Sequence, residues 1–401
     1  MHYSSEINSL TPENPLRIII VGGGIAGVAA AEAARKQNAD CAITILSAEL
    51  HLPYHRVRVA DLLRDEQLAE RLTLHPESWY EERRIDILLN VSVTDIRIQS
   101  KEIVLSSGQT MPYDKLILAT GSRSYIPPVK GSEHPAVHSL WTMNDALELG
   151  QQLNGDKRAV VIGGGLLGLE TAWQLRNRGC KVTVVEFLPR LLAKQLTEEA
   201  SRIFLERVES RDIEIMTSAS AVSIDADPEN PSQIRGVTLQ DGRFLAADLV
   251  VISAGVRANT ELAEQAGLEI GIRIKVNDRM ETSGTDIYAA GDATELQDGS
   301  WHGLWMVAQQ EGHTAGMNAA GGSSTLILKT SPYMLNSIDT RLISAGLVQG
   351  PELEHMIIEE ETDLEKLTYK YKVLDSEHHL KGFILLGDVA EQGRLLQQIS
   401  V

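Results

Sequence analysis

Short apolar runs that stop abruptly at glycine recur along the chain and predict buried strands followed by tight turns. The first run, residues 17–21, leads through three consecutive glycines, starting at Gly22, into an alanine-rich helical stretch at residues 28–34. Another apolar strand is expected at residues 42–46. A strand, a glycine turn, a helix and a second strand in this order predict a βαβ unit of a parallel sheet.

The same pattern returns in the middle of the chain, where a strand at residues 159–162, a helix at 169–178 and a strand at 181–185 are expected. Further patterns predict buried strands at 116–119 and 248–254, a helix at 307–320, and alternating strands within 331–401. Repeated βαβ units predict an α/β protein with two Rossmann-like domains, followed by a small C-terminal α+β domain.

Both turns have the spacing Gly-x-Gly-x-x-Gly, in which the glycines allow a tight turn, the approach of a pyrophosphate, and close packing of the helix. The helix N-terminus then attracts the phosphates. In each unit a glutamate, Glu49 or Glu186, follows the second strand, where an acid can bind ribose hydroxyls. Ordinary βα turns are the alternative, but the repetition predicts two dinucleotide sites. The glycines are Gly22, Gly24 and Gly27, then Gly163, Gly165 and Gly168.

Composition excludes several classes of partner. The net charge of −18 argues against nucleic acid and anionic membranes, and no apolar run approaches the length of a membrane span. The polar residues 1–15 lack an apolar signal core and are interpreted as a flexible leader. Two widely spaced cysteines predict a reducing, cytoplasmic location, and no metal site is expected.

Four further motifs carry a family resemblance: Pro53-Tyr54-His55-Arg56, the segment 282–292 ending in Gly291-Asp292, residues 384–388, and residues 393–396. With the two glycine fingerprints, they resemble the FAD-dependent NADH:rubredoxin oxidoreductases and the flavoprotein part of NAD(P)H nitrite reductases. Both groups belong to the pyridine nucleotide-disulfide oxidoreductase superfamily. The likeness extends from about Pro15 to the C-terminus.

The resemblance implies a domain order in which one nucleotide-binding domain is inserted into the other. A split FAD-binding domain is expected at 16–125 and 255–325, an NAD(H)-binding domain at 126–254, and a C-terminal interface domain at 326–401. It also implies noncovalent FAD contacts at Gly22, Gly24, Ile25, Ala26, Gly27, Glu49, Arg56, Val93, Thr120, Gly121 and Asp292. Contacts with NADH or NAD⁺ are implied at Gly163, Gly165, Leu167, Gly168, Glu186 and Gly255.

Glu170, two residues after the last glycine, is implied as a candidate catalytic residue near flavin and nicotinamide. A first-turn glutamate that the helix dipole favours is an equally good interpretation. In ferredoxin-reducing relatives a lysine pairs with this glutamate, whereas Asp61 occupies the matching position here. Where NADH oxidases and peroxidases have a redox cysteine, this chain has Ala48.

The missing cysteine predicts that flavin exchanges electrons directly with a partner. The resemblance implies an oxidoreductase that links NAD(H) to a rubredoxin-like or iron–sulfur protein, either free or as the NAD(H)-linked subunit of a larger enzyme. An NADH oxidase that reduces O₂ and a non-catalytic NADH-sensing flavoprotein remain the alternatives.

Overall fold

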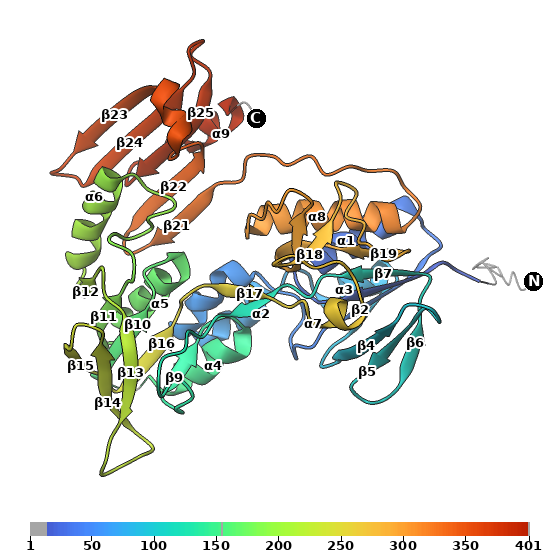
Figure 1. The fold of residues 1–401 in the computed structure, drawn as a ribbon, viewed down its shortest axis with the longest axis horizontal. Helices are drawn as coiled ribbons and strands as arrows, with labels where there is room; N and C mark the ends of the chain where they lie inside the picture. The colour runs from blue at the N-terminus through green and yellow to red at the C-terminus, as the bar shows by residue number, and fades with distance from the viewer. Residues whose placement is uncertain (1–13, 154, 400–401) are drawn as a thin grey trace, which may run out of the picture. The chain divides into compact units, whose positions relative to one another are not determined.

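The computed structural model describes residues 14–153 and 155–399, and its contacts divide the chain into two compact units (Figure 1). Most of the expected leader, residues 1–15, lies outside the described residues. The first unit contains residues 1–54, 73–122 and 258–328, and the second contains 55–72, 123–257 and 329–401. In the described part of the chain, no helix is both long and apolar enough to cross a membrane.

The first unit is built on a five-stranded parallel sheet in the order β19-β7-β1-β2-β3. The expected strand–turn–helix–strand unit is confirmed by β1, α1 and β2. The elements of this layer are β1 (Arg17–Val21), α1 (Ile25–Gln37), β2 (Ala42–Leu46), β3 (Ile85–Leu88), β7 (Lys115–Leu118), β19 (Ile287–Ala289) and α8 (Trp305–Ala319).

Helices α1 and α8 pack unusually closely, because both present small residues at the contact. A Cβ atom added to Gly312 would lie 2.1 Å from the Ala26 carbonyl oxygen, and one on Gly316 would lie 2.0 Å from that of Ala30. Glycines at these two positions therefore let α8 lie directly against the helix that follows the first glycine turn.

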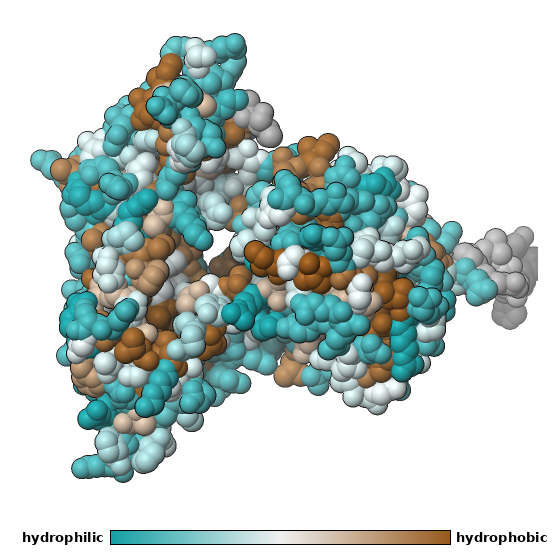
Figure 2. Space-filling view, viewed as in Figure 1, coloured by the Kyte–Doolittle hydropathy of each residue, from teal (hydrophilic) through white to brown (hydrophobic). Residues whose placement is uncertain are grey.

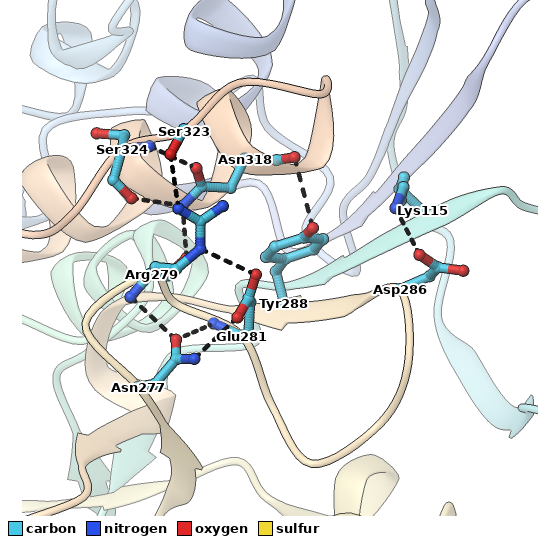
Figure 3. Close-up of polar contacts among 9 residues, drawn as sticks. All are labelled: Lys115, Asn277, Arg279, Glu281, Asp286, Tyr288, Asn318, Ser323 and Ser324. Atoms are coloured by element: carbon cyan, nitrogen blue, oxygen red, sulfur yellow. Dashed lines mark hydrogen bonds and ion pairs between the residues drawn. The ribbon is translucent and has the colours of Figure 1, made fainter.

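Smaller elements complete the first unit. A polar network joins the end of α8 to the strand that leads into Gly291-Asp292 (Figure 3). In it, Asn318 donates to the carbonyl oxygens of Arg279 and Ser324, each over 2.8 Å. The remaining elements are α3 (Glu77–Glu82), β4 (Val93–Arg97), β5 (Glu102–Leu105), β6 (Thr110–Pro112), α7 (Glu261–Gln265), β18 (Ile274–Val276), η3 (Gly291–Ala293) and β20 (Thr294–Leu296).

The second unit repeats this plan with a parallel sheet in the order β12-β11-β10-β16-β9. The predicted strand–turn–helix–strand repeat is confirmed by β10, α5 and β11. The elements are β9 (Val137–Ser139), α4 (Met143–Gln151), β10 (Arg158–Ile162), α5 (Leu166–Asn177), β11 (Lys181–Val185), α6 (Glu198–Glu209), β12 (Ile213–Met216), β13 (Ala221–Ala226), β14 (Ile234–Leu239), β15 (Phe244–Ala246) and β16 (Leu249–Ile252). The chain passes from one unit to the other within two short strands, β8 (Ser122–Ser124) and β17 (Val256–Ala258).

The C-terminal part of the second unit is a five-stranded antiparallel sheet in the order β21-β22-β25-β24-β23. One of its two edge strands, residues 357–363, is exposed along almost its whole length. That strand begins with two exposed isoleucines, Ile357 and Ile358, and continues with hydrophilic residues. Hydrophilic residues are prominent on this part of the surface (Figure 2). The elements are β21 (Tyr333–Ser337), β22 (Thr340–Gly346), η4 (Pro351–His355), β23 (Ile357–Asp363), β24 (Thr368–Leu374), β25 (Leu380–Leu386) and α9 (Gln392–Gln398).

Residues 55–72 are mostly helical. The chain is helical from Arg56 onward, because Val59, Leu62 and Leu63 are buried and anchor successive turns. The helical elements here are η1 (Arg56–Leu63), η2 (Glu66–Leu68) and α2 (Ala69–Leu72). This segment belongs to the second unit.

Candidate functional site

The first glycine turn is closed by contacts that admit no side chain. Gly22 has a φ of +124°, and a Cβ there would lie 2.0 Å from the Ala119 carbonyl oxygen. A Cβ on Gly27 would lie 2.0 Å from the Gly22 carbonyl oxygen, because the helix crosses directly over the turn. By contrast, a Cβ on Gly24 would meet no atom within 4 Å. Gly22 and Gly27 thus shape the turn, while Gly24 leaves an open approach to the backbone.

The second turn has the same geometry. Gly163 has a φ of +117°, and its Cβ would lie 2.1 Å from the Ser253 carbonyl oxygen. The matching contact of Gly168 is with the Gly163 carbonyl oxygen, at 2.0 Å, and Gly165 again faces open space. An anion can approach Gly24 or Gly165 without displacing protein atoms, so both turns fit a pyrophosphate group.

The helices after both turns begin without a side-chain cap. Gly24 is the N-cap residue of α1 and Gly165 that of α5, and neither helix start receives a capping bond from a side chain at that position. Ile25, Ala26 and Leu167 lie in the first turns of these helices. Backbone N–H groups at a helix N-terminus bind anions well, aided by the helix dipole.

Each sheet places the predicted glutamate beside its turn, but the two glutamates have different neighbours. Glu49 accepts a hydrogen bond from the Tyr54 hydroxyl over 2.7 Å, and its carbonyl oxygen accepts from Asn90 N over 3.0 Å. The second bond brings the start of β4, with half-buried Val93, toward the Glu49 loop. Glu186 instead accepts from the backbone N–H groups of Gly164, over 2.6 Å, and Leu188, over 2.7 Å.

Asp292 lies in η3, just beyond the carboxyl end of β19, and is held by two side chains. The Ser122 hydroxyl donates to its Oδ2 over 2.7 Å. Arg273 donates from Nε to its carbonyl oxygen over 3.1 Å and stacks 3.6 Å above the Trp301 ring. Since Arg273 is only 8% exposed, this bond fixes the backbone of Asp292.

Thr120 and Gly121 end the strand beside β1 in the same unit. Asn259 ties them down: its Nδ2 donates to the Thr120 carbonyl oxygen over 2.8 Å, and its backbone N–H donates to that of Gly121 over 2.9 Å. Gly121 has a φ of +65°, which favours glycine at this bend.

Arg56 and Gly255 belong to the second unit. Arg56 donates to the Trp141 carbonyl oxygen over 2.7 Å. Gly255 has a φ of +104° and accepts from Tyr125 N over 2.9 Å. Its Cβ position is open, as at the central glycines of both turns.

Glu170 lies in the first turn and a half of α5, which packs against η1. Burial of the carboxyl group, together with the negative charge of Asp61, raises the pKa of Glu170 to about 8. Asp61 accepts from Arg58 over 2.9 Å. Asp61 therefore disfavours the charged form of Glu170.

Sequence patterns did not single out Ser122, Arg273 or Asn259. Ser122 directly follows the Thr120-Gly121 motif, which is the one local signal that could have drawn attention to it. The other residues reach the site from segments whose patterns indicate only a strand, a loop or a helix.

Residues 16–312 match the family model described as pyridine nucleotide-disulphide oxidoreductase. The chain belongs to this family. The predicted resemblance and fold class are confirmed. Both cysteines of this pyridine nucleotide-disulphide oxidoreductase, Cys41 and Cys180, are buried and free.

Similar proteins include the assimilatory nitrate reductase electron transfer subunit of Bacillus subtilis, 31% identical over 96% of this chain and 49% of that protein. The rubredoxin-NAD(+) reductase of Pseudomonas putida is 35% identical over 69% of this chain and 71% of its own. The structure resembles the ferredoxin reductase for the CYP199A2 system from Rhodopseudomonas palustris, with a TM-score of 0.86, 27% identity, and coverage of 96% and 95%. The chain spans about half the length of the first curated relatives that it matches.

Proposed function

We propose that this protein is an FAD-containing oxidoreductase that exchanges hydride with NAD(H) and electrons with a rubredoxin-like or iron–sulfur partner. The observation that carries this proposal is the duplicated glycine turn. Two turns with the same open central glycine, each beside an acid, provide for two dinucleotides. A one-nucleotide enzyme would need only one of them.

We assign the first turn to FAD. Gly24, with the first turn of α1, would hold the pyrophosphate, while Glu49 would bind the adenosine ribose beside the start of β4. Asp292 would bind the ribityl chain, because Ser122 and Arg273 fix both its side chain and its backbone. The helix N-terminus of α8, whose N-cap is Leu304, offers a positive dipole end that favours negative charge on a nearby ligand.

We assign the second turn to NAD(H). Gly165 and the start of α5 would hold its pyrophosphate, and Glu186 would bind the ribose hydroxyls. Glu186 would also repel a 2′-phosphate, so we propose NADH as the preferred nucleotide. Glu170, as a neutral acid below about pH 8, would not repel the anionic nucleotide that binds at the start of the same helix.

Bound FAD would supply the chemistry that links a two-electron hydride carrier to one-electron acceptors. The chain's own residues align, hold and shield the two nucleotides. The relatives' names support a protein acceptor, since they include a nitrate reductase electron transfer subunit and a rubredoxin reductase. We also retain the proposal of a cytoplasmic location.

Flavin analysis followed by acceptor kinetics tests this proposal. Acid should release FAD from purified protein, and anaerobic NADH should bleach the bound flavin. Rubredoxin or a small ferredoxin should then be reduced faster than O₂, with a neutral quinone as a control for flavin reduction itself.

Three results would count against the proposal in different ways. Release of FMN, or no flavin after reconstitution, would refute the cofactor assignment. Bleaching by NADH with no faster reduction of any protein acceptor would refute the partner class. Oxygen uptake with NADH alone that matches the protein-acceptor rate would favour an NADH oxidase.

A further inference from the structure

A buried glutamate lies beneath the turn that carries Asp292 and is not needed to explain the fold of α8. Glu311 is only 8% exposed, although it sits in the middle of a helix with a solvent face. Its Oε2 accepts from Gly291 N over 2.7 Å and lies 3.1 Å from the Thr294 hydroxyl oxygen. A carboxyl group so placed contacts both ends of η3.

The turn itself is tightly constrained. Gly291 has a φ of +82°, and a Cβ there would lie 3.0 Å from the Cβ of Ala26, in the first turn of α1. The Thr294 hydroxyl donates to the Gly291 carbonyl oxygen over 2.8 Å. The residue before Asp292 is therefore braced against the start of the helix that follows the first glycine turn, with Glu311 as its hydrogen-bond acceptor.

Burial favours a proton on Glu311, because the described residues around it supply hydrogen bonds but no positive charge. The bond from Gly291 N and the Thr294 hydroxyl, which donates toward Oε2 over 3.1 Å, both favour the charged carboxylate. Burial outweighs them and raises the pKa of Glu311 to about 7, and the nearby negative charge of Asp292 adds to that rise.

Several charged groups on the elements packed around Glu311 have other partners or are exposed. On α1, Glu32 pairs with Lys36 and Arg35 donates to backbone carbonyl oxygens, while on β7 Lys115 pairs with Asp286. On α8 itself His313 is exposed. The other groups are Tyr288 of β19, Glu295 of β20, and Asp292 of η3, which is the one that raises the pKa of Glu311.

We propose that Glu311, in its protonated form, is a positioning residue that holds Asp292 in place for the flavin through Gly291 N–H. Flavin is therefore held more tightly in weakly acidic than in weakly basic solution. The inference rests on the proposed function. An anionic cofactor beside Asp292 adds negative charge and excludes water, and both effects favour the neutral form of Glu311. Flavin binding is thus linked to uptake of a proton.

The direct test measures the dissociation constant of FAD from reconstituted full-length protein between pH 6 and 8.5. In the wild type it should rise about three- to tenfold, since linkage to one proton allows about tenfold per pH unit at most. E311Q keeps an acceptor for Gly291 N and for the Thr294 hydroxyl but has no proton to lose, so its affinity for FAD should match the wild type at pH 6 and stay constant. E311L should bind FAD about tenfold more weakly throughout, because it leaves the Gly291 N–H unpaired.

Glu295 provides the matched control, because it is equally buried, at 6% exposure, but accepts from Ile272 N instead of Gly291. E295Q should retain the wild-type pH dependence. The apoprotein gives a second readout: a raised carboxyl pKa means that stability is lost as pH rises from the usual 4.5 toward 7. The melting temperature of apo wild type should fall relative to apo E311Q over that range.

This inference would be overturned if the FAD dissociation constant of E311Q rose with pH as steeply as that of the wild type, or if E311L bound FAD as tightly as E311Q. Either result would leave the proposed function intact. If apo wild type and apo E311Q had the same melting temperature at all pH values, the protonated state of Glu311 would be refuted as well. If the wild type bound no FAD at any pH, the proposed function would fail and this inference with it.

Discussion

The two glycine turns share a backbone geometry but differ in what the following helix presents to its surroundings. Helix α1 is lined with alanines that are buried against the sheet and α8. Helix α5 carries Glu170 and, one turn later, partly exposed Trp173, over which Arg176 lies 5.5 Å from the ring. The fingerprint predicts the same pyrophosphate site in both units, whereas the rest of each helix determines which side chains lie near that site.

The glutamates beside the two turns, Glu49 and Glu186, also differ in their hydrogen-bond partners. Glu49 bonds to a tyrosine hydroxyl, while Glu186 bonds to two backbone N–H groups, one of them within its own glycine turn. We interpret the first turn as a site for a permanently held cofactor and the second as a site for an exchanging one. The following variants test this comparison.

The largest effects are expected from Gly22→Ala and Gly163→Ala, since each new Cβ would collide with a carbonyl oxygen at a positive φ. Each change should lower the free energy of unfolding by roughly 2–5 kcal/mol. Gly22→Ala should abolish flavin binding. Gly163→Ala should retain flavin but lose bleaching by NADH. Melting curves, flavin content and anaerobic NADH titration measure these effects.

Gly24→Ala and Gly165→Ala are the controls, because their Cβ atoms meet no protein atom within 4 Å. Their melting temperatures should match the wild type, while affinity for FAD or NADH, respectively, should fall about ten- to hundredfold, equivalent to roughly 1.4–2.7 kcal/mol. Full flavin affinity in Gly24→Ala would show that the open space is not the pyrophosphate site.

The next effect concerns the choice between NADH and NADPH. The wild type should favour NADH by about ten- to several-hundredfold in kcat/KM, which corresponds to roughly 1–4 kcal/mol of charge repulsion. Glu186→Gln keeps an acceptor for Gly164 N but removes the charge, so it should narrow this ratio about tenfold or more. Glu49→Gln should leave it unchanged. An equal shift in both variants would contradict the assignment of the two turns.

A smaller effect, on the pH dependence of the melting temperature, should follow from substitution of Glu170 or Asp61. Because the pKa of Glu170 is raised to about 8, its contribution to stability is present at low pH and lost as pH rises from 4.5 toward 8. The wild type should therefore lose melting temperature relative to Glu170→Gln over this range. Asp61→Asn should shift the loss to lower pH. No shift in Asp61→Asn would mean that burial alone sets this pKa.

The smallest effects are expected at the two cysteines, which lie just before the second strand of each parallel sheet. Both are buried, and burial raises the pKa of each thiol, so neither is a reactive thiolate. Cys41→Ser and Cys180→Ser should each leave NADH-driven quinone reduction nearly intact. A large loss of turnover with flavin and stability retained would refute direct electron exchange with the flavin.

The sequence by itself determined the repeated strand–turn–helix units, because their signals are local. Apolar runs ending at Gly22 and Gly163, with helical periodicity beyond, predict the same elements in almost any context. The order of the elements, the positions of Glu49 and Glu186, and the α/β class follow from these patterns. The roles assigned to the individual residues stay predictions.

Tertiary structure alone decided which polar groups meet. Ser122 and Asp292 lie 170 positions apart and form a hydrogen bond only because two neighbouring strands end at the same edge of the sheet. The raised pKa of Glu311 and of Glu170 depends on burial and on acids brought from other elements. Periodicity reports which face of an element is buried, but not which partner lies against it, so these pairings become visible only in the folded chain.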